Sequence, residues 1–288
     1  ISVFSWFSII GITLGVAAII IVMSVMNGFR EELTKRILGI NGHINIYSKS
    51  GEIFENEVLR INEIKVNRTK ILPLVETEAL LISEESSKGI FLKGYDKLQN
   101  SEKIFINKNI VEGRIYSNNT NEVVVGYVLA NSLGLSLGDK IKIAIPKTDK
   151  TIFGEIPRFK TLYIVGIFNL GMYEYDLNFV FTNPRIPRKL LMFESDSYNK
   201  IEIFTSDPQN IEVVQQQLNL KIDKINDLLY SISWKEVNNS LLNALQVEKN
   251  VMFLILTLII IVASMNIISG LIIFVKEKNK DIGILKTI

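Results

Sequence analysis

The chain has 288 residues, of which 48% are apolar and 22% are charged, and its mean hydropathy is +0.26. A typical soluble domain of this length is less hydrophobic, so the apolar excess must be located. It lies in two runs without Asp, Glu, Lys or Arg, residues 1–29 and residues 250–275. Each run exceeds the roughly 18 apolar residues that mark a membrane-spanning helix, so we expect a membrane protein.

The charge balance and the lack of cysteine exclude several classes of function. The formal net charge is +2, and residues 30–249 hold 28 of the 32 basic and 28 of the 30 acidic residues. A segment without net charge does not steer nucleic acid onto itself, so no nucleic-acid partner is expected. Without cysteine, the chain has no disulfide, no thiolate zinc site and no cysteine nucleophile.

Two spans place the segment between them on one side of the bilayer and both ends on the other. The flank after the second run is rich in lysine, which is typical of cytoplasmic flanks. We expect a first span over residues 1–29, a stalk over 30–42, an extracytoplasmic domain over 43–232, a second stalk over 233–250, a second span over 251–275 and a cytoplasmic helix over 276–288. Because the chain opens at Ile1, we also expect it to be part of a longer protein.

The middle segment has the pattern of a mixed α+β domain. Strands are expected over residues 43–47, 69–83, 140–145, 161–168, 178–181 and 200–204, and helices over 56–64 and 208–220. The strand at 140–145 alternates most clearly, and residues 206–208 (Ser-Asp-Pro) are a start signal for the second helix. Apolar residues at helical spacing predict that both stalks are helices: Phe29, Leu33 and Ile37, then Trp234, Val237, Leu241 and Leu245.

No motif predicts an active site, a metal centre or a bound cofactor in this chain. Residues 134–140 resemble a phosphate loop, but the glycines are too close together and Asp139 stands where phosphate would sit. We interpret this stretch as a helix end and a turn. The single histidine, His43, has no metal-ligand spacing around it and is interpreted as an ordinary residue at the entry to the domain.

Small residues form a stripe along the first span: Ser8, Gly11, Gly15 and Ala18. Such a stripe lets another helix approach closely. The stripe continues with larger side chains: Val22, Val25, Met26 and Phe29. One interpretation is helix packing followed by lipid-facing bulk, and the alternative is a lateral entrance that holds an acyl chain.

Polar residues in and after the second span indicate partners. Asn266 lies near Ser264 and Ser269, and an amide in hydrocarbon needs a partner helix, so we expect a bundle of helices. In the lysine-rich flank, Ile282 and Leu285 form a small apolar face among charges. This face suits either an interfacial helix or a helix that docks on a cytoplasmic partner.

Residues 146–160 are predicted to be a fifteen-residue loop between two strands, long enough to be functional. The loop mixes apolar side chains with basic ones: Ile152, Phe153, Ile156, Pro157 and Phe159 with Lys147, Lys150, Arg158 and Lys160. This composition suits capture of a protein partner with an acidic or apolar rim. The alternative is that the apolar residues fold back onto the domain.

At these residues the sequence resembles the permease subunits of the lipoprotein-releasing ABC transporter, the Lol system. Ser-Val-Met-Asn-Gly-Phe at 24–29 resembles the first span of that family, and 266–287 resemble its second span and coupling helix. Gly-Glu-Ile-Pro-Arg at 154–158 and Gly-Met-Tyr-Glu-Tyr-Asp at 171–176 are similar to its periplasmic hook region. The turn at 133–139 is shared with the wider macrolide-exporter-like group.

The resemblance implies a multi-pass protein of the bacterial inner membrane, with a macrolide-exporter-like domain in the periplasm and two further spans after the coupling helix. It implies a non-catalytic permease whose partners are a separate ABC ATPase that holds ATP and magnesium, a second permease copy or paralogue, a periplasmic lipoprotein carrier, a lipoprotein substrate and membrane lipids. The implied carrier-binding residues are Phe153, Gly154, Ile156, Pro157, Arg158 and Phe159. The implied acyl-chain path is Val22, Val25, Met26 and Phe29, and the implied ATPase-coupling residues are Lys278, Asp281, Ile282 and Leu285.

Two alternatives remain open. A macrolide-exporter-type mechanotransmission permease shares this plan but should lack the Pro-Arg loop. A two-span sensor receptor would have a ligand-binding ectodomain and a cytoplasmic output module.

Overall fold

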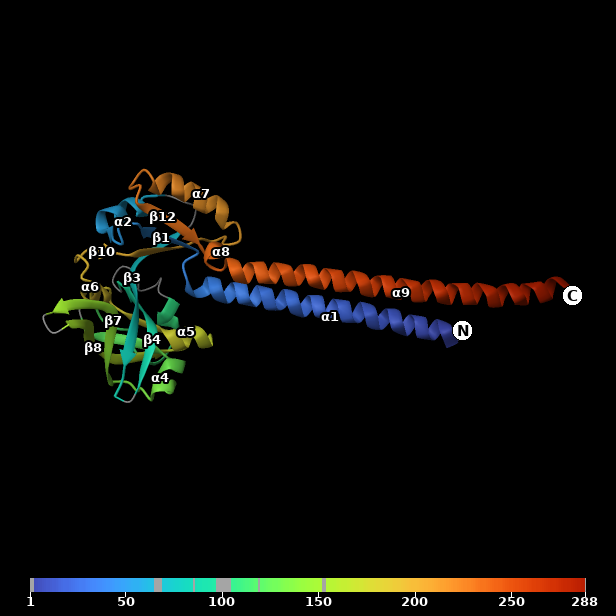
Figure 1. Cartoon of the computed structure of the whole chain (residues 1–288), viewed down its shortest axis with the longest axis horizontal. Coiled ribbons are helices and arrows are strands. Elements are labelled where there is room, and N and C mark those ends of the chain that lie inside the picture. The colour runs from blue at the N-terminus through green and yellow to red at the C-terminus, as the bar shows by residue number, and fades with distance from the viewer. Residues whose placement is uncertain are drawn as a thin grey trace. The chain divides into compact units, whose positions relative to one another are not determined.

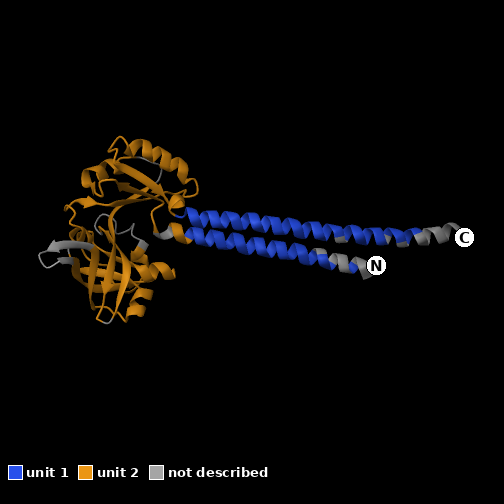
Figure 2. Ribbon diagram, in the orientation of Figure 1, with its two compact units in different colours: residues 1–35, 238–288 blue, residues 36–237 orange. Residues whose placement is uncertain are grey.

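The computed structural model describes residues 3–64, 69–84, 86–96, 105–118, 120–151 and 154–287 (Figure 1). The chain divides into two compact units, shown in Figure 2. Residues 1–35 and 238–288 form the helical unit, and residues 36–237 form the α+β unit. The predicted α+β class is therefore confirmed for the central part of the chain.

Two long helices make up the helical unit. Helix α1 runs over Val3–Ile40 and α9 over Asn239–Thr287, with 38 and 49 residues. The last five residues of α1, 36–40, belong to the α+β unit. At 1.5 Å per residue the two helices are about 57 and 74 Å long, against about 30 Å for the hydrocarbon core of a bilayer. Stretches of 26 residues in α1 and 35 in α9 are apolar enough to cross a membrane. Each helix is thus long enough to hold both a span and a stalk, as the sequence predicts.

The apolar side chains of these helices are exposed along much of their length. On α9, Phe253 is 72% exposed and Leu254 is 70% exposed. Water would penalise such surface by about 25 cal/mol per Å², whereas lipid covers it at no cost. The length and the exposed surface together support two membrane spans.

One prediction about the second helix needs correction. Its stalk was expected to begin at residue 233, but Ser233 closes a strand, and the short helix α8 (Trp234–Val237) is separated from α9 by a turn at Asn238. The hydroxyls of Ser264 and Ser269 donate to the backbone carbonyls of Ile260 and Met265 one turn earlier, and the helix bundle expected from Asn266 stays a prediction. The side chain of Asn266 lies outside the described residues.

The α+β unit is built on one large mixed sheet of ten strands. Its strands are β1 (Ile44–Ser48), β3 (Lys70–Ile82), β4 (Ser87–Tyr95), β5 (Ile110–Gly113), β6 (Glu122–Gly126), β7 (Lys140–Thr151), β8 (Gly154–Phe168), β9 (Phe179–Thr182), β11 (Lys200–Phe204) and β12 (Leu229–Ser233). A small second sheet pairs β2 (Ile53–Phe54) with β10 (Ser197–Tyr198). Besides α8, the described helices of this unit are α2 (Glu55–Asn62), the 3₁₀ turn η1 (Phe105–Asn109), α4 (Tyr127–Leu133), α5 (Tyr173–Asn178), α6 (Arg185–Leu191) and α7 (Ile211–Ile222).

Part of the large sheet closes into a barrel. Hydrogen bonds join β3, β4, β9, β6, β8 and β7 in that order, and β7 pairs back onto β3. The interior is filled by fully buried aliphatic side chains from all six strands: Leu81, Leu92, Val123, Ile143, Leu162 and Val180. On the other side of β3, strands β11, β1 and β12 continue the sheet, and α7 packs on β12.

Most predicted elements are confirmed within a few residues. The strands expected at 43–47, 69–83, 140–145 and 200–204 correspond to β1, β3, the start of β7 and β11. Helix α7 begins at Ile211 rather than 208, because the Asp207 carboxylate accepts from the Gln209 amide and the Asn210 side chain and so forms a turn before the helix. The sequence pattern missed the strands β2, β4, β5, β6, β10 and β12 and the helices α5 and α6.

Candidate functional site

The predicted loop at 146–160 is instead a hairpin arm, and the loop assignment is wrong. Strands β7 and β8 pair as far as Thr151 opposite Gly154, with Thr148 opposite Pro157. The register shifts between Ala144 and Thr148, where β7 carries two more residues than β8. Pro146 lies in this bulge, where its missing N–H breaks no ladder bond. The fifteen residues between the strands expected at 140–145 and 161–168 had suggested a loop, but both strands continue through them and the bulge accommodates Pro146.

The arm separates the predicted carrier-binding residues onto two faces of β8. Pro157 is exposed and Phe159 is 60% exposed, and both line the same groove. Arg158 lies between them and is partly buried, and its guanidinium donates to the Leu190 carbonyl at the end of α6 (3.1 Å). Alternate side chains of a strand point to opposite faces, so Arg158 holds the base of the arm. Phe153 and the side chain of Ile156 lie outside the described residues, and Gly154 contributes backbone to the ladder.

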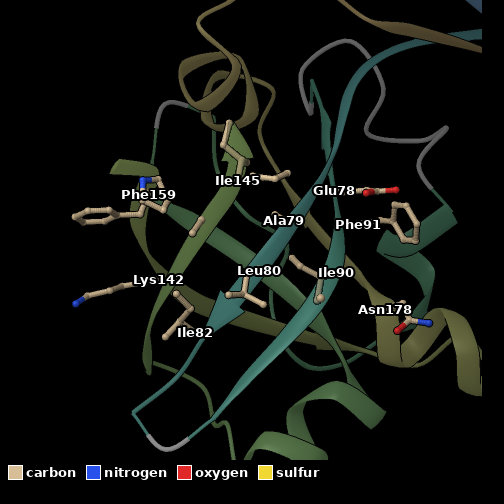
Figure 3. A pocket seen from close by; sticks show the side chains of 14 residues that line it. Glu78, Ala79, Leu80, Ile82, Ile90, Phe91, Lys142, Ile145, Phe159 and Asn178 are labelled. Atoms are coloured by element: carbon tan, nitrogen blue, oxygen red, sulfur yellow. The ribbon is translucent and has the colours of Figure 1, made fainter. Parts of the chain in front are cut away.

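The groove lies on the outer face of the barrel, next to the base of the arm (Figure 3). It has a volume of about 850 Å³ and is formed by β3, β4, β7 and β8. Phe159 and Phe91 stand at opposite ends of it, with Leu80 and Ile82 between them. Its rim carries one acid and one base, Glu78 and Lys142. An open apolar hollow of this kind is typical of a surface that binds a protein or a lipid.

The predicted acyl-chain path lies on α1, within the helical unit. Val22, Val25 and Phe29 are 39%, 67% and 54% exposed, and Met26 is partly covered. Nothing in the described chain lies within 4 Å of the position that a Cβ would take at Gly11 or Gly15. There is therefore room for another helix at these two glycines, and packing of a helix on the small-residue stripe stays a prediction.

The predicted coupling residues fall at the end of α9. Lys278 is exposed on this helix. The backbone of Asp281, Ile282 and Leu285 continues the same helix, and their side chains lie outside the described residues. The second stalk, the second span and the coupling segment thus share one unbroken helix from Asn239 to Thr287.

The segment 171–176 is not part of the arm, contrary to the interpretation of it as hook region. Figure 1 shows α5 on the side of the barrel opposite the free end of β7 and β8. This segment contacts the last turn of α1 instead. The Arg36 guanidinium donates to the Gly171 carbonyl (2.9 Å), and the Asn41 amide donates to the Tyr175 hydroxyl (2.6 Å). We call these four residues the joint.

His43 has a larger structural role than an ordinary entry residue. It is 8% exposed, and its Nδ1 accepts from the Thr205 amide while its Nε2 bonds the Leu38 carbonyl of α1. Its backbone N–H donates to Ile203 on β11, and its carbonyl accepts from Trp234 at the start of α8. Burial lowers the pKa of His43 against the opposing effect of its two backbone hydrogen bonds. The neutral ring and the backbone of His43 therefore link β11 to the end of α1 and to the start of α8.

A buried ion cluster lies beside the joint. The Lys93 ammonium is 3.1 Å from the Glu202 carboxylate and 3.4 Å from that of Glu76. Lys200 approaches the same two acids at 3.4 and 3.0 Å. The Tyr95 hydroxyl donates to Glu202 (2.8 Å), which leaves the charges paired and hydrogen-bonded.

The charges of the cluster shift the pKa values of its members. Burial raises the pKa of Glu76, but the ammonium groups of Lys93 and Lys200 outweigh burial and hold it at about 2. The same two cations lower the pKa of the fully buried Glu202 despite its desolvation. Burial lowers the pKa of Lys93, and the neighbouring acids, Glu202 foremost, more than reverse this effect. Burial also lowers the pKa of Lys200, and Glu202 and Glu76 more than reverse this effect, so all four groups are charged at neutral pH.

Sequence reasoning missed both the joint and the ion cluster. Glu202 alternates with Ile201 and Ile203 along β11, a pattern that normally marks a solvent-facing acid, yet Glu202 is 0% exposed. Lys93 is similarly hidden within β4. The segment 171–176, which the resemblance had grouped with the hook region, holds two of the four joint residues, and no sequence pattern indicated the ion cluster. Among the described residues, no group of three acids or histidines is arranged to hold a metal ion.

Comparison with known proteins decides the family. The model for the "MacB-like periplasmic core domain" matches residues 5–220. The "Lipoprotein-releasing system transmembrane protein LolC" of Neisseria meningitidis serogroup B is 31% identical over 284 residues, which cover 98% of this chain and 68% of that protein. The chain belongs to the LolC/LolE permease family.

LolE of Haemophilus influenzae is also similar to the chain, with 28% identity over 296 residues that cover 98% of this chain and 68% of that protein. The crystal structure of the periplasmic region of MacB from Actinobacillus actinomycetemcomitans matches with 12% identity and a TM-score of 0.46, over 73% of this chain and 96% of that one. Membership in the LolC/LolE family confirms the resemblance that the sequence motifs indicated. It favours a permease over a sensor receptor.

Proposed function

We propose that this chain is the permease subunit of a transporter that extracts lipoproteins from the bacterial inner membrane and passes them to a soluble periplasmic carrier. The observation that carries the proposal is the match over nearly the whole chain to proteins named for lipoprotein release. The two apolar helices and the α+β unit between them support a membrane-anchored domain in the periplasm.

Energy for this step comes from a separate subunit in our proposal. Each CH₂ of a lipid anchor costs about 0.8 kcal/mol to remove from the bilayer, so extraction of several acyl chains requires an external source of energy. The sequence has no phosphate loop, so we assign ATP and magnesium to a partner ATPase that docks near Lys278, Asp281, Ile282 and Leu285. A second permease, identical or paralogous, would pack on the open stripe at Gly11 and Gly15.

The substrate would enter at the exposed apolar surface of α1. Val25 and Phe29 present this surface one turn apart, and Val22 extends it. An acyl chain that leaves the bilayer at this point stays in contact with apolar side chains, which lowers the cost of its transfer. Membrane lipids would occupy the same surface between cycles.

The carrier would bind at the hairpin arm and the adjoining groove. Phe159 is the largest exposed side chain of the arm among those described, and it stands at one end of the groove. Aromatic side chains in apolar surroundings supply most of the binding energy at protein interfaces. Pro157 adds a rigid apolar surface beside it.

The proposal is tested by reconstitution. The full-length permease and its ATPase are placed in liposomes with a fluorescent triacylated lipoprotein, and purified carrier is added outside. We expect ATP-dependent transfer of the lipoprotein to the carrier, and no transfer with a non-hydrolysable ATP analogue. ATP hydrolysis without any transfer would contradict the proposed function and favour an exporter-type permease.

A further inference from the structure

The end of α1 and the residue that follows it are attached to the barrel at two points in the joint. Arg36 and Asn41 lie five residues apart, and both bond to the segment that leads into and forms α5. Gly171 has φ of +73°, a conformation that an L side chain rarely adopts, and the turn it makes presents its carbonyl to Arg36. Asn41 is held a second time, because its Oδ1 accepts from the buried Lys93 ammonium (3.2 Å).

A stack of aromatic rings continues from the joint to the groove. The Tyr175 ring lies on Phe179 at 5.0 Å with an angle of 11° between the ring planes. Phe179 in turn stacks on Phe91 at 5.4 Å. Phe91 is 37% exposed and stands at the end of the groove opposite Phe159. The Lys93 ammonium lies 5.1 Å from the centre of the Phe179 ring, so the cation that holds Asn41 also faces this stack.

We propose that the end of α1 controls the shape of the groove through Tyr175, Phe179 and Phe91. This inference rests on the proposed function, because it assumes that α1 moves during ATP-driven lipoprotein release. Arg36, Asn41 and Tyr175 are positioning residues in this account. They contact neither the lipoprotein nor the carrier, and they set the place of the aromatic ring that ends the groove.

Close packing of the aromatic rings would transmit a movement of α1 to the groove. The Tyr175, Phe179 and Phe91 rings stack in sequence at 5.0 and 5.4 Å, and close-packed side chains pass on a displacement, so movement of Tyr175 would shift Phe179 and Phe91. The 2.6 Å hydrogen bond from Asn41 links the Tyr175 hydroxyl directly to the residue that follows α1. His43 ties the same end of α1 to β11, which lies on the other side of β3 from β4. Movement of α1 thereby acts on β11 and on the groove at the same time.

The test compares four variants of the full-length permease, assembled with its ATPase in liposomes. Tyr175→Phe removes the hydroxyl and keeps the aromatic stack. Asn41→Ala removes both side-chain bonds, whereas Asn41→Asp keeps an acceptor for Lys93 and one for the Tyr175 hydroxyl. Tyr173→Phe is the matched control, since Tyr173 lies on the same short helix and is 68% exposed.

The decisive quantity is the amount of lipoprotein released to the carrier per ATP hydrolysed. We expect Tyr175→Phe and Asn41→Ala to lower this ratio by about 5-fold or more, within the range of measured coupling energies. Complex assembly and basal ATPase activity should be retained, and Asn41→Asp and Tyr173→Phe should stay close to the parent protein. A role in folding alone would lower assembly and leave the ratio unchanged.

Two results separate failure of this inference from failure of the proposed function. If the parent protein releases lipoprotein and Tyr175→Phe and Asn41→Ala match its ratio, the joint does not control release and the inference is wrong. If the parent protein itself transfers no lipoprotein, the proposed function is wrong. A loss of ratio in Asn41→Asp equal to that in Asn41→Ala would also overturn the inference, because the retained bonds would then have no effect.

Discussion

The Lys93 ammonium and the Glu202 carboxylate lie 3.1 Å apart, and their side chains are 2% and 0% exposed. This pair belongs to strands β4 and β11, which flank β3 on its two sides. It therefore joins the barrel to the rest of the sheet at the point where α1 enters the α+β unit. Because both charges are buried, removal of either one leaves the other poorly compensated away from water, which destabilises the fold.

Removal of one partner of this pair should be strongly destabilising. Glu202→Ala leaves Lys93 facing a buried space with only Glu76 as a counter-charge, so we expect a loss of about 3 kcal/mol in the free energy of unfolding. Glu202→Gln keeps the shape and an acceptor for Tyr95 and should cost less. Denaturant unfolding of the purified chain in detergent measures both. Equal stability of Glu202→Ala and the parent would show that the pair does not hold the two parts together.

Acid should weaken the α+β unit over a defined range of pH. The pKa of Glu76 is held at about 2, below its usual value of 4.5, so its charge stabilises the folded state above about pH 4.5. This stabilisation is lost progressively as the pH falls from 4.5 towards 2. Thermal unfolding followed between pH 7 and pH 2 should show the loss. In Glu76→Gln the curve should be flatter, and a curve parallel to that of the parent would contradict the account.

Phe159 should contribute a large part of the affinity for the carrier. Phe159→Ala removes an exposed ring from the end of the groove, and we expect the dissociation constant to rise at least about tenfold. Tyr163→Ala is the matched control, since Tyr163 is 45% exposed on the same strand and does not line the groove. Binding of purified carrier to the full-length complex is the measurement. Similar affinity in both variants would place the carrier elsewhere.

Replacement of Arg158 should lower the stability of the protein and leave its affinity for the carrier nearly unchanged, the reverse of the effect expected for Phe159. Its guanidinium bonds the Leu190 carbonyl at the end of α6, so Arg158→Ala should lower the free energy of unfolding by about 1 kcal/mol. The dissociation constant for the carrier should change by less than about threefold, as is usual when a substituted residue lies outside the contact surface. A large loss of affinity at unchanged stability would mean that Arg158 touches the carrier directly.

The sequence correctly predicted those helices and strands in which a single physical signal dominates. Charge-free runs predicted the two long helices, and the alternation of Ile141, Ile143 and Ile145 predicted the start of β7, because burial of one face leaves a period of two. The hairpin arm was mistaken for a loop because strands were expected only over 140–145 and 161–168, so the fifteen residues between them were taken as a connection. Only the pairing of β7 with β8 across a bulge shows how Pro146 and Pro157 are accommodated.

The joint and the ion cluster could not be predicted from local pattern. Their members come from positions far apart in the chain, and each looks like an ordinary surface residue within its own strand or helix. Glu202 becomes buried because β4 and β11 lie on either side of β3 and bring Lys93 opposite it. Such a contact depends on which strands pair with β3, and the order of the strands in a sheet cannot be read from a single sequence.

Photo-crosslinking in cells tests the central claim most directly. A photoreactive amino acid replaces Phe159 in the full-length protein, and the captured partner is identified by mass spectrometry. The account predicts a covalent adduct with a small soluble periplasmic protein that binds lipoproteins, and a loss of this adduct when Leu80 at the centre of the groove is changed to Glu. Capture of an envelope-spanning adaptor, or no adduct at Phe159 while release continues, would contradict the claim that this arm delivers lipoproteins to a carrier.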